Sequence, residues 1–414
     1  MTEKNTDLTT AKPKVVLAFS GGLDTSFCIL YLKNQGYDVI SVTVDTGGFS
    51  QGELSKLDGR SKELGAIQHI TLDGKTRVFD DHIAYLVKGN VLRGNVYPLC
   101  VGAERVVQAR MIAEICTELG ADYVAHGSTG AGNDQIRFDV ALRSLCPHLT
   151  ILAPVRDEEW TREASAQYLN KHGFPVTLET KDYSINEGIW GVTIGGKETH
   201  DSWEVPPSNA YPWTKPVEKL TQEAWTGILS FKAGVITAID GQNMSGVEAV
   251  EFLNKKGSEY GVGRGIHVGD TIIGIKGRIA FEAPGAEILI KAHRELEKLV
   301  LTRWQTMLKE QLGTFYGMLL HEAHYFDPAM RDLEAFIDSS QERVEGEVKI
   351  TLQLGHVLIT GVRSPYSMMN TAVGTYGEQN RMWTAQDAKG FCNLYGMQSI
   401  LSTLALQSAQ EEQK

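Results

Sequence analysis

Short apolar runs alternate with segments of helical composition over residues 14–153 of the chain. The runs are rich in β-branched residues, as expected of parallel strands buried on both faces, and lie at 15–19, 39–44, 66–72, 123–125 and 150–153. Helical segments separate several of these runs, at 25–33, 54–64 and 104–119. Strands that alternate with helices form βαβ units, in which the strands run parallel. The pattern therefore predicts an α/β fold built on a doubly wound parallel sheet.

The pattern changes after about residue 175. The stretch 183–216 combines Gly, Pro and Trp without a clear period, which predicts a long and partly irregular connection. Beyond Pro284 and Gly285, a strong helical period runs over 286–312. Alternating residues at 347–354 lead through a Gly-His pair into 357–359, which predicts an antiparallel hairpin. These elements predict a second, α+β domain.

The last part of the chain begins at Thr384, a plausible helix N-cap, and carries an apolar stripe to Leu406. So little chain remains to cover this stripe that the helix is expected to pack either on its own domain or on another subunit. The expected division is therefore a parallel-sheet domain at 14–178, an α+β domain at 179–383 and a terminal helix at 384–414.

The charge balance argues against a nucleic-acid partner. The 414-residue chain has 40 Lys and Arg against 51 Asp and Glu, a formal net charge of -11, and the basic residues form no run. Proteins that hold DNA or RNA usually present a basic face to the phosphates. Small-molecule substrates are therefore favoured.

The cysteines and the hydropathy pattern indicate a cytoplasmic protein. The five cysteines are an odd number, widely spaced and without a C-x-x-C pair, which argues against a disulfide framework and against a zinc site. No apolar stretch reaches the length of a membrane span, and the first apolar run is too short for a signal peptide. We therefore expect reduced thiols, no protein-held metal and no membrane contact.

The segment 20–26, Ser-Gly-Gly-Leu-Asp-Thr-Ser, joins the first predicted strand to the first helix. Gly21 and Gly22 lack Cβ, so the backbone can turn sharply and bring its N–H groups close to an anion. The helix that follows directs its unpaired N–H groups and positive dipole end at the same point. This point is the carboxyl end of a parallel strand, where open α/β sheets bind ligands.

Comparison of the segment 20–26 with known nucleotide-binding motifs limits the reactions that it can serve. Neither G-x-x-x-x-G-K-[ST] nor G-x-G-x-x-G occurs here, so the lysine of a γ-phosphoryl-transfer loop is missing. The segment resembles instead the pyrophosphate-binding loop of the N-type ATP pyrophosphatases, which release AMP. A plain tight turn capped by Asp24 and Thr25 is the structural alternative.

A second polar cluster, the segment 126–138, follows the strand predicted at 123–125. It contains three glycines, which are costly to order in a purely structural segment. Arg137 follows Asn133 by four positions and Asp134 by three, so the three side chains share a helix face. A carboxylate, an amide and a guanidinium on one face can recognise the ammonium and carboxylate of an amino acid. An ordinary helix cap with a solvated Arg is the alternative.

Together these motifs make the chain similar to the argininosuccinate synthase family. The matching segments are A-[FY]-S-G-G-L-D-T-S at 18–26, H-G-x-T-G-x-G-N-D-Q-x-R-F at 126–138 and S-Q-E-R-V-E-G at 340–346. Shorter matches occur in family order at 183–184, 261–264 and 361–365, so the resemblance covers nearly the whole chain. Other ATP pyrophosphatases share the first motif only.

The resemblance implies a reaction, its substrates and an assembly. The ureido oxygen of citrulline attacks the α-phosphorus of ATP, which arrives with Mg²⁺, and pyrophosphate leaves. The amine of aspartate then displaces AMP from citrullyl-AMP to give argininosuccinate, a step of arginine biosynthesis. The family implies a homotetramer.

The resemblance also implies site residues. Positions that match the ATP site are Ala18, Phe19, Ser20, Gly21, Gly22, Leu23, Asp24, Thr25, Ser26, Val44 and Gly127. Those that match the aspartate site are Thr129, Asn133 and Asp134, and those that match the citrulline site are Tyr97, Asn133, Arg137, Ser184 and Thr193. Catalysis in such a site is mostly positioning and charge stabilisation, and Asp134 is the candidate for a general base.

Four positions at the citrulline end depart from the family's pattern. Gly102 and Thr193 stand where Ser is common, Gly269 falls on a customary glutamate, and Phe281 on a customary tyrosine. Two hydroxyls and a carboxylate are therefore lost, and one charged hydrogen bond contributes roughly 1.5–3 kcal/mol. Either other groups such as His267 or Asp270 compensate, or the substrate is a citrulline whose α-amino group is acylated.

Two further functions remain open from the sequence. A tRNA-adenylating pyrophosphatase is disfavoured by the acidic balance and the scattered cysteines. A non-enzymatic ligand sensor on the same fold is disfavoured by the intact loop at 20–26.

Overall fold

The computed structural model describes residues 12–176, 182–369 and 382–412. The chain forms two compact units, Met1–Tyr366 and Ser367–Lys414. The domain boundary predicted between residues 178 and 179 lies outside the described residues, and the three-part division stays a prediction.

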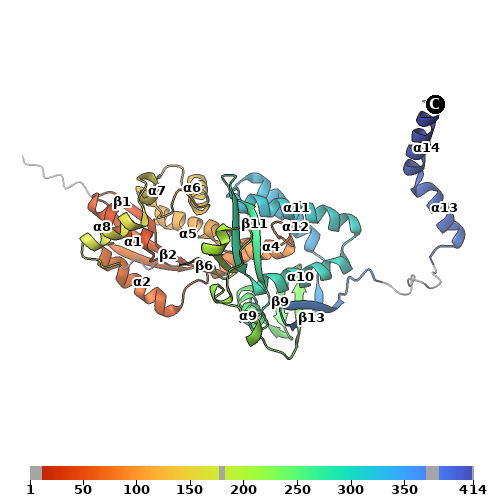
Figure 1. Ribbon diagram of the computed structural model, residues 1–414, viewed down its shortest axis with the longest axis horizontal. Helices are drawn as coiled ribbons and strands as arrows, with labels where there is room; N and C mark the ends of the chain where they lie inside the picture. Colours follow the sequence, from red (N-terminus) through yellow and green to blue (C-terminus); the bar gives the residue numbers. More distant parts are fainter. Residues whose placement is uncertain (1–11, 177–181, 370–381, 413–414) are drawn as a thin grey trace, which may run out of the picture. The chain divides into compact units, whose positions relative to one another are not determined.

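A five-stranded parallel sheet opens the larger unit (Figure 1). Its strands stand in the order β3-β2-β1-β4-β5, so the chain reverses its direction of winding between β1 and β4. The strand bounds are Lys14–Ala18 for β1, Asp38–Asp45 for β2, Gln68–Asp73 for β3, Tyr123–Ala125 for β4 and Thr150–Leu152 for β5. The predicted strands are confirmed to within two residues. Ligands bind at such a reversal, beyond the carboxyl ends of the strands.

Helices cover both faces of this sheet, which confirms the doubly wound prediction. One apolar core joins β1 to α1 (Leu23–Asn34), α2 (Gln51–Leu64) and α8 (Arg162–Lys171). The other face packs on α5 (Glu104–Leu119) and α6 (Asp134–Leu145). Local sequence fixes the helix ends: Ser50 and Glu53 form a capping box, and Gly120 ends α5 in the left-handed region.

Two antiparallel sheets lie in the rest of the larger unit, together with several helices. One has the order β10-β9-β8-β13-β14 and the other the order β11-β12-β7-β6. The strands of the first are Trp225–Lys232 (β8), Val235–Ile239 (β9), Gln242–Asn243 (β10), Gly346–Gln353 (β13) and His356–Arg363 (β14). Those of the second are Ser184–Gly188 (β6), Gly191–Gly195 (β7), Arg264–Asp270 (β11) and Lys276–Glu282 (β12). The predicted hairpin is confirmed as β13 and β14.

Two predictions for this region need correction. The stretch 183–216 is irregular only after residue 195, because its first part forms the hairpin of β6 and β7, which pairs with β12. The helix predicted over 286–312 is two helices, α10 (Pro284–Val300) and α11 (Arg303–His321). Thr302 separates them by forming a capping box with Gln305 at the start of α11.

Further helices and turns complete the larger unit. They are α3 (Lys75–Val78), the π-helical turn η1 (Phe79–Ile83), α4 (Ala84–Lys88), α7 (Pro154–Asp157), α9 (Gly246–Glu259), α12 (Pro328–Gln341), and three 3₁₀ turns at Lys197–His200, Ser208–Ala210 and Val217–Lys219.

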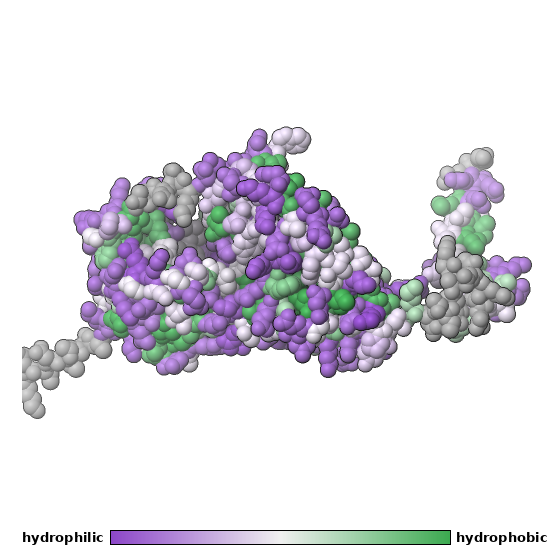
Figure 2. Space-filling view, turned by 90° about the horizontal axis from the view of Figure 1, so that it is seen from below, coloured by the Kyte–Doolittle hydropathy of each residue, from purple (hydrophilic) through white to green (hydrophobic). Residues whose placement is uncertain are grey.

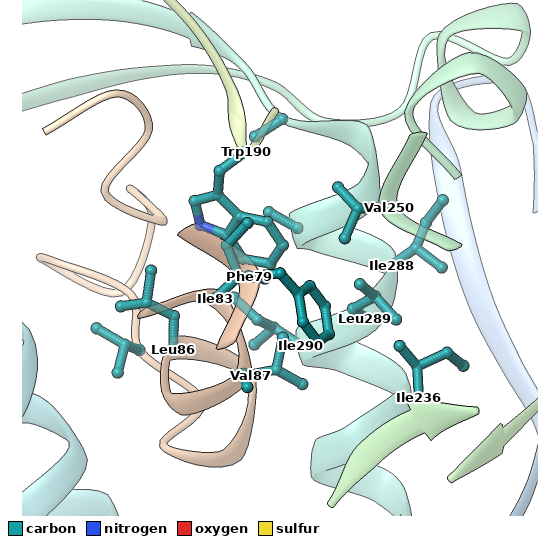
Figure 3. Packing of buried hydrophobic residues seen from close by; sticks show 14 of the residues in the cluster. Phe79, Ile83, Leu86, Val87, Trp190, Ile236, Val250, Ile288, Leu289 and Ile290 are labelled. Atoms are coloured by element: carbon teal, nitrogen blue, oxygen red, sulfur yellow. The ribbon is translucent and has the colours of Figure 1, made fainter. Parts of the chain in front are cut away.

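The largest apolar core lies in the second half of this unit. The segment between the parallel strands β3 and β4 also contributes side chains to it. Phe79, Ile83 and Leu86 of that segment pack with Trp190 and with α10, as Figure 3 shows. The Trp190 indole is buried and donates a hydrogen bond to the carbonyl of Pro98 at 2.8 Å. Residues of the first half are thereby anchored beside the antiparallel sheets.

The smaller unit consists of α13 (Ala385–Tyr395) and α14 (Met397–Glu411). Thr384 caps α13, as predicted, but the single predicted helix is interrupted at Gly396. No residue of the two helices is buried, and hydrophobic side chains stand on their surface (Figure 2). They include Phe391, Leu394, Tyr395, Met397, Ile400, Leu401, Leu404 and Leu406.

A search of the described helices for a membrane span finds none with the necessary length and hydropathy.

Candidate active site

A cleft of about 1630 Å³ lies at the carboxyl ends of β1, β2 and β4. Its opposite wall comes from the hairpin of β6 and β7 and from β11 and β12. The cleft therefore joins the end of the parallel sheet, where nucleotides bind in α/β folds, to a sheet of the second half.

The loop at 20–22 has the geometry of an anion-binding turn. Gly21 has a φ of 75°, and a Cβ there would overlap the side chain of Leu57, so only glycine fits. Gly22 is the N-cap of α1 and has no side chain to occupy the first-turn N–H groups. The Ser20 and Thr25 hydroxyl oxygens lie 3.2 Å apart and close the turn. The free N–H groups at the cleft wall are suited to phosphate oxygens.

The end of β4 packs directly against this loop. A Cβ on Gly127 would stand 3.0 Å from the Thr25 methyl and 3.2 Å from the backbone of Asp24. The preceding His126 is 2.8 Å from Asp139, which also pairs with Arg156 at 3.1 Å. Burial acts to raise the pKa of Asp139, but these two partners outweigh it and lower the pKa to about 2. The carboxylate thereby holds the β4 end in place as a fixed anion.

Asp134 lines the cleft and forms ion pairs with two arginines. Its two oxygens accept hydrogen bonds from Arg105 and from Arg137, each at 2.9 Å. Burial acts to raise the pKa of Asp134, but the two guanidinium groups outweigh it and lower the pKa to about 2. The helix-face prediction for Asp134 and Arg137 is thus matched by an ion pair one turn apart.

Asn133 and Arg137 both reach beyond their own helix. The Asn133 amide oxygen accepts a hydrogen bond from the Ile272 backbone N–H at 3.0 Å, so it ties α6 to the turn between β11 and β12. Arg137 is buried and donates through Nε to the carbonyl oxygen of His321 at 3.2 Å. Asn133 makes no side-chain cap bond to its own helix, which argues against an ordinary helix cap.

The residues matched to a citrulline site lie at different depths. Ser184 is exposed and lines the cleft. Tyr97 and Thr193 are each only 6% exposed and do not line it. The Tyr97 ring stacks on His267 at 5.4 Å and also packs on Phe281 at 5.2 Å. The acceptor end thus continues from the cleft into a tightly packed layer.

The cleft brings most of the matched ATP positions together. Those that line it are Ala18, Phe19, Ser20, Gly22, Leu23, Asp24, Thr25, Val44 and Gly127. Gly21 and Ser26 stand just behind this wall, linked to each other by a hydrogen bond of 3.5 Å. Asp134 lines the cleft, whereas Thr129 is exposed beside it.

Several charged residues of the cleft are absent from the set predicted from the sequence. Arg105, Arg162, Lys276 and Arg278 all line it. Burial raises the pKa of Asp24, and the charge of Arg162 opposes that shift. Only Arg105 could have been suspected from the sequence, because it closely follows the segment of Tyr97. The other three residues lie on elements that only the tertiary fold brings to the cleft.

The fold and this cleft define the class of the protein. The model described as "Arginosuccinate synthase N-terminal HUP domain" matches residues 14–175, so the first half is a nucleotide-binding HUP domain. The model described as "Arginosuccinate synthase C-terminal domain" matches residues 183–402. The chain belongs to the argininosuccinate synthase family.

Curated relatives agree over nearly the full length. Argininosuccinate synthase of Xanthomonas campestris is 42% identical over 94% of this chain and 97% of the relative. That of Xylella fastidiosa is 41% identical over 94% of this chain and 96% of the relative. That of Methanocaldococcus jannaschii is 40% identical over 93% of this chain and 97% of the relative.

Proposed function

We propose that this chain is an ATP-dependent ligase that joins citrulline, free or acylated on its α-nitrogen, to aspartate and produces the corresponding argininosuccinate, AMP and pyrophosphate. The observation that carries the proposal is the uncapped glycine loop of β1 and α1, which lines the cleft at the end of a parallel strand. The relatives' shared name supports the substrates and a place in arginine biosynthesis.

Two displacements make up the proposed reaction. The ureido oxygen of citrulline attacks the α-phosphorus of MgATP, and the bond from that phosphorus to the bridging oxygen breaks, which releases pyrophosphate. The aspartate amine then attacks the ureido carbon, loses a proton and expels AMP. Loop N–H groups suit the charge of the departing pyrophosphate, and the walls of the cleft hold the reactants in line.

The residue roles follow the positions matched to the family. The loop 18–26 with Val44 and Gly127 holds ATP; Thr129, Asn133 and Asp134 hold aspartate; Tyr97, Asn133, Arg137, Ser184 and Thr193 face the acceptor. Asp134 remains the candidate base, but a carboxylate with a pKa of about 2 is a weak proton acceptor. Its two ion pairs favour a role in orienting Arg105 and Arg137.

A pyrophosphate-release assay tests this function. The purified chain receives MgATP and aspartate, and ureido acceptors are added one at a time. We expect AMP and pyrophosphate to appear in equal amounts only when an acceptor is present, and added tRNA to change neither. Formation of ADP, or AMP formation that requires tRNA, would contradict the proposal.

We further propose a cytoplasmic homotetramer that depends on the segment 384–414. All five cysteines are free thiols, which suits a reducing compartment. The two terminal helices bury no residue within their own unit, and they expose an apolar set that a second copy could cover. The division into domains at 14–178 and 179–383 belongs to the same proposal.

Deleting residues 384–414 is expected to reduce the assembly below the tetramer. The apolar faces of α13 and α14 would no longer hold the copies together, while the larger unit keeps its own cores. Light scattering measures the mass, and a full-length Leu401→Asp, Leu404→Asp variant separates the loss of apolar contact from truncation. A deletion variant that is still tetrameric would refute this role.

A further inference from the structure

Four basic side chains gather behind the acceptor end of the cleft, on separate elements. They are Arg93, Arg137, His267 and His321, which we call the basic cluster. Arg137 Nη2 lies 3.3 Å from His321 Nδ1, and both residues are buried. Burial lowers the pKa of both imidazoles, and the charge of Arg93 lowers it further. The Arg93 guanidinium donates to the backbone carbonyl of Asp270 at 3.0 Å. The Tyr97 ring stacks on His267 of this cluster.

Two atoms of the basic cluster are buried without a hydrogen-bond partner in the described part of the chain. They are Nε2 of His267 and Nε2 of His321, and the His321 residue is only 9% exposed. An unsatisfied buried polar group destabilises the fold, so folded proteins rarely keep one without a use. A ligand that brings hydrogen-bonding groups to this layer would satisfy both nitrogens.

Two carboxylates beside the basic cluster, those of Asp134 and Asp270, already have cationic partners. Asp134 holds Arg105 and Arg137, and Asp270 pairs with Lys276 at 2.7 Å. Glu104, at the start of α5, is 1% exposed, and burial raises its pKa to about 7. It faces the backbone of Gly188 and Trp190 rather than the cluster. One Glu104 oxygen has no hydrogen-bond partner in the described residues, but it is directed at Gly188, away from the cluster.

The same surroundings oppose any added positive charge. Burial lowers the pKa of His267, and the charge of Arg93 lowers it further. Burial also lowers the pKa of His321, to about 3, with Arg137 as the next cause. Both imidazoles are therefore neutral near pH 7, and each offers one donor and one acceptor nitrogen.

Two glycines keep further side chains out of this layer. A Cβ on Gly269 would overlap the His267 ring, so that ring fills the space of a side chain at 269. A Cβ on Gly102 would stand 3.2 Å from the Arg137 guanidinium. Neither a carboxylate at 269 nor a hydroxyl at 102 is therefore present to receive an α-ammonium. His267 compensates for the missing volume at 269 and not for the missing charge.

We infer that the acceptor is a ureido acid whose α-nitrogen is acylated, an N-acylcitrulline in place of free citrulline. The inference rests on the proposed function and narrows its substrate class. An amide nitrogen is neutral, so it avoids the repulsion that an ammonium would meet from the guanidinium groups of Arg93 and Arg137. The amide N–H and the acyl oxygen offer one donor and one acceptor to the two unpartnered imidazole nitrogens, and an acidic cap would also suit Arg93.

The test compares three acceptors on the full-length chain. Pyrophosphate release is measured with MgATP, aspartate and either citrulline, Nα-acetylcitrulline or Nα-succinylcitrulline. We expect kcat/KM to be at least about 10-fold higher for one of the acylated acceptors than for citrulline, the effect of one lost charged hydrogen bond. Equal or higher kcat/KM for citrulline would overturn the inference and leave the proposed function standing. No pyrophosphate with any of the three would overturn both.

A pair of variants tests whether the basic cluster causes the preference for acylated acceptors. His267→Ala with Gly269→Glu makes room for a carboxylate at 269 and supplies it, which should shift the kcat/KM ratio towards citrulline by about 10-fold or more. Ile273→Glu adds the same charge at the exposed turn between β11 and β12 and should leave the ratio unchanged. An equal shift in both variants would contradict a specific role for the cluster. The comparison of acceptors on the unaltered chain holds even if the double variant does not fold.

Discussion

Replacing Gly22 by aspartate is expected to lower pyrophosphate release from ATP at least about 100-fold while the fold keeps its stability. Gly22 is the N-cap of α1, with a φ of -70° that any residue can adopt, and a Cβ there has an ordinary contact of 3.5 Å with the Ser20 hydroxyl. Aspartate is a good N-cap residue, so the helix itself gains slightly. Its charge, however, would meet the phosphates, and like charges in contact cost several kcal/mol.

The matched control is Gly22→Asn, which has nearly the same size and caps helices equally well but carries no charge. We expect it to lose less than about 10-fold in kcat/KM, in keeping with the absence of charge repulsion. Steady-state pyrophosphate release and thermal unfolding are measured on both variants. Normal turnover by Gly22→Asp, or equal losses in the two variants, would show that the loop does not bind an anion.

Replacing Asp134 by asparagine is expected to reduce kcat/KM for pyrophosphate release by about 100-fold. The amide keeps the size of the side chain but gives up the charge-assisted hydrogen bonds to Arg105 and Arg137. Two such bonds at about 1.5 kcal/mol each amount to about 3 kcal/mol, or roughly two decades in rate. Arg137 would then lose its orientation towards the acceptor.

Asp338→Asn is the control for this change. Asp338 makes a similar ion pair, with Lys88 at 2.7 Å, but it lies on α12 and does not line the cleft. It should keep normal turnover. If both variants lose activity equally, or if Asp134→Asn is fully active, the ion pairs of Asp134 have no specific part in the reaction.

The pKa of Asp134 also determines the pH range over which its ion pairs stabilise the folded chain. Since the folded-state pKa is lowered from 3.8 to about 2, the ion pairs stabilise the folded chain above about pH 4. This stability is lost as the pH falls towards 2. The activity should therefore show no titration step from Asp134 near neutral pH.

Much of the parallel-sheet half could be predicted because its signals are local. The apolar runs of β1 and β2 are buried on both faces, and α5 ends at Gly120. The hydrophobic pattern and the helix-ending glycine therefore specify these elements. The loop at 20–26 was predicted for the same reason, since strand, glycines and helix follow one another directly.

The second half was harder because its strands depend on distant partners. β6 and β7 are short segments that pair with each other, and β7 is fixed in a sheet only by pairing with the distant β12, where Glu282 lies opposite Val192. The break between α10 and α11 did have a signal, the capping box of Thr302 and Gln305, which the continuing apolar period concealed. The basic cluster had none, since His321 reaches Arg137 across 184 positions of sequence.

The central claim, that the loop joining β1 to α1 cups the phosphates that depart, is tested most directly by a crystal structure of the chain with MgATP. The account predicts β- and γ-phosphate oxygens within hydrogen-bond distance of the backbone N–H groups of residues 21–25, with the α-phosphorus directed into the cleft towards Asp134 and Ser184. A triphosphate bound away from this loop, or one whose γ-phosphate alone faces the acceptor, would contradict it.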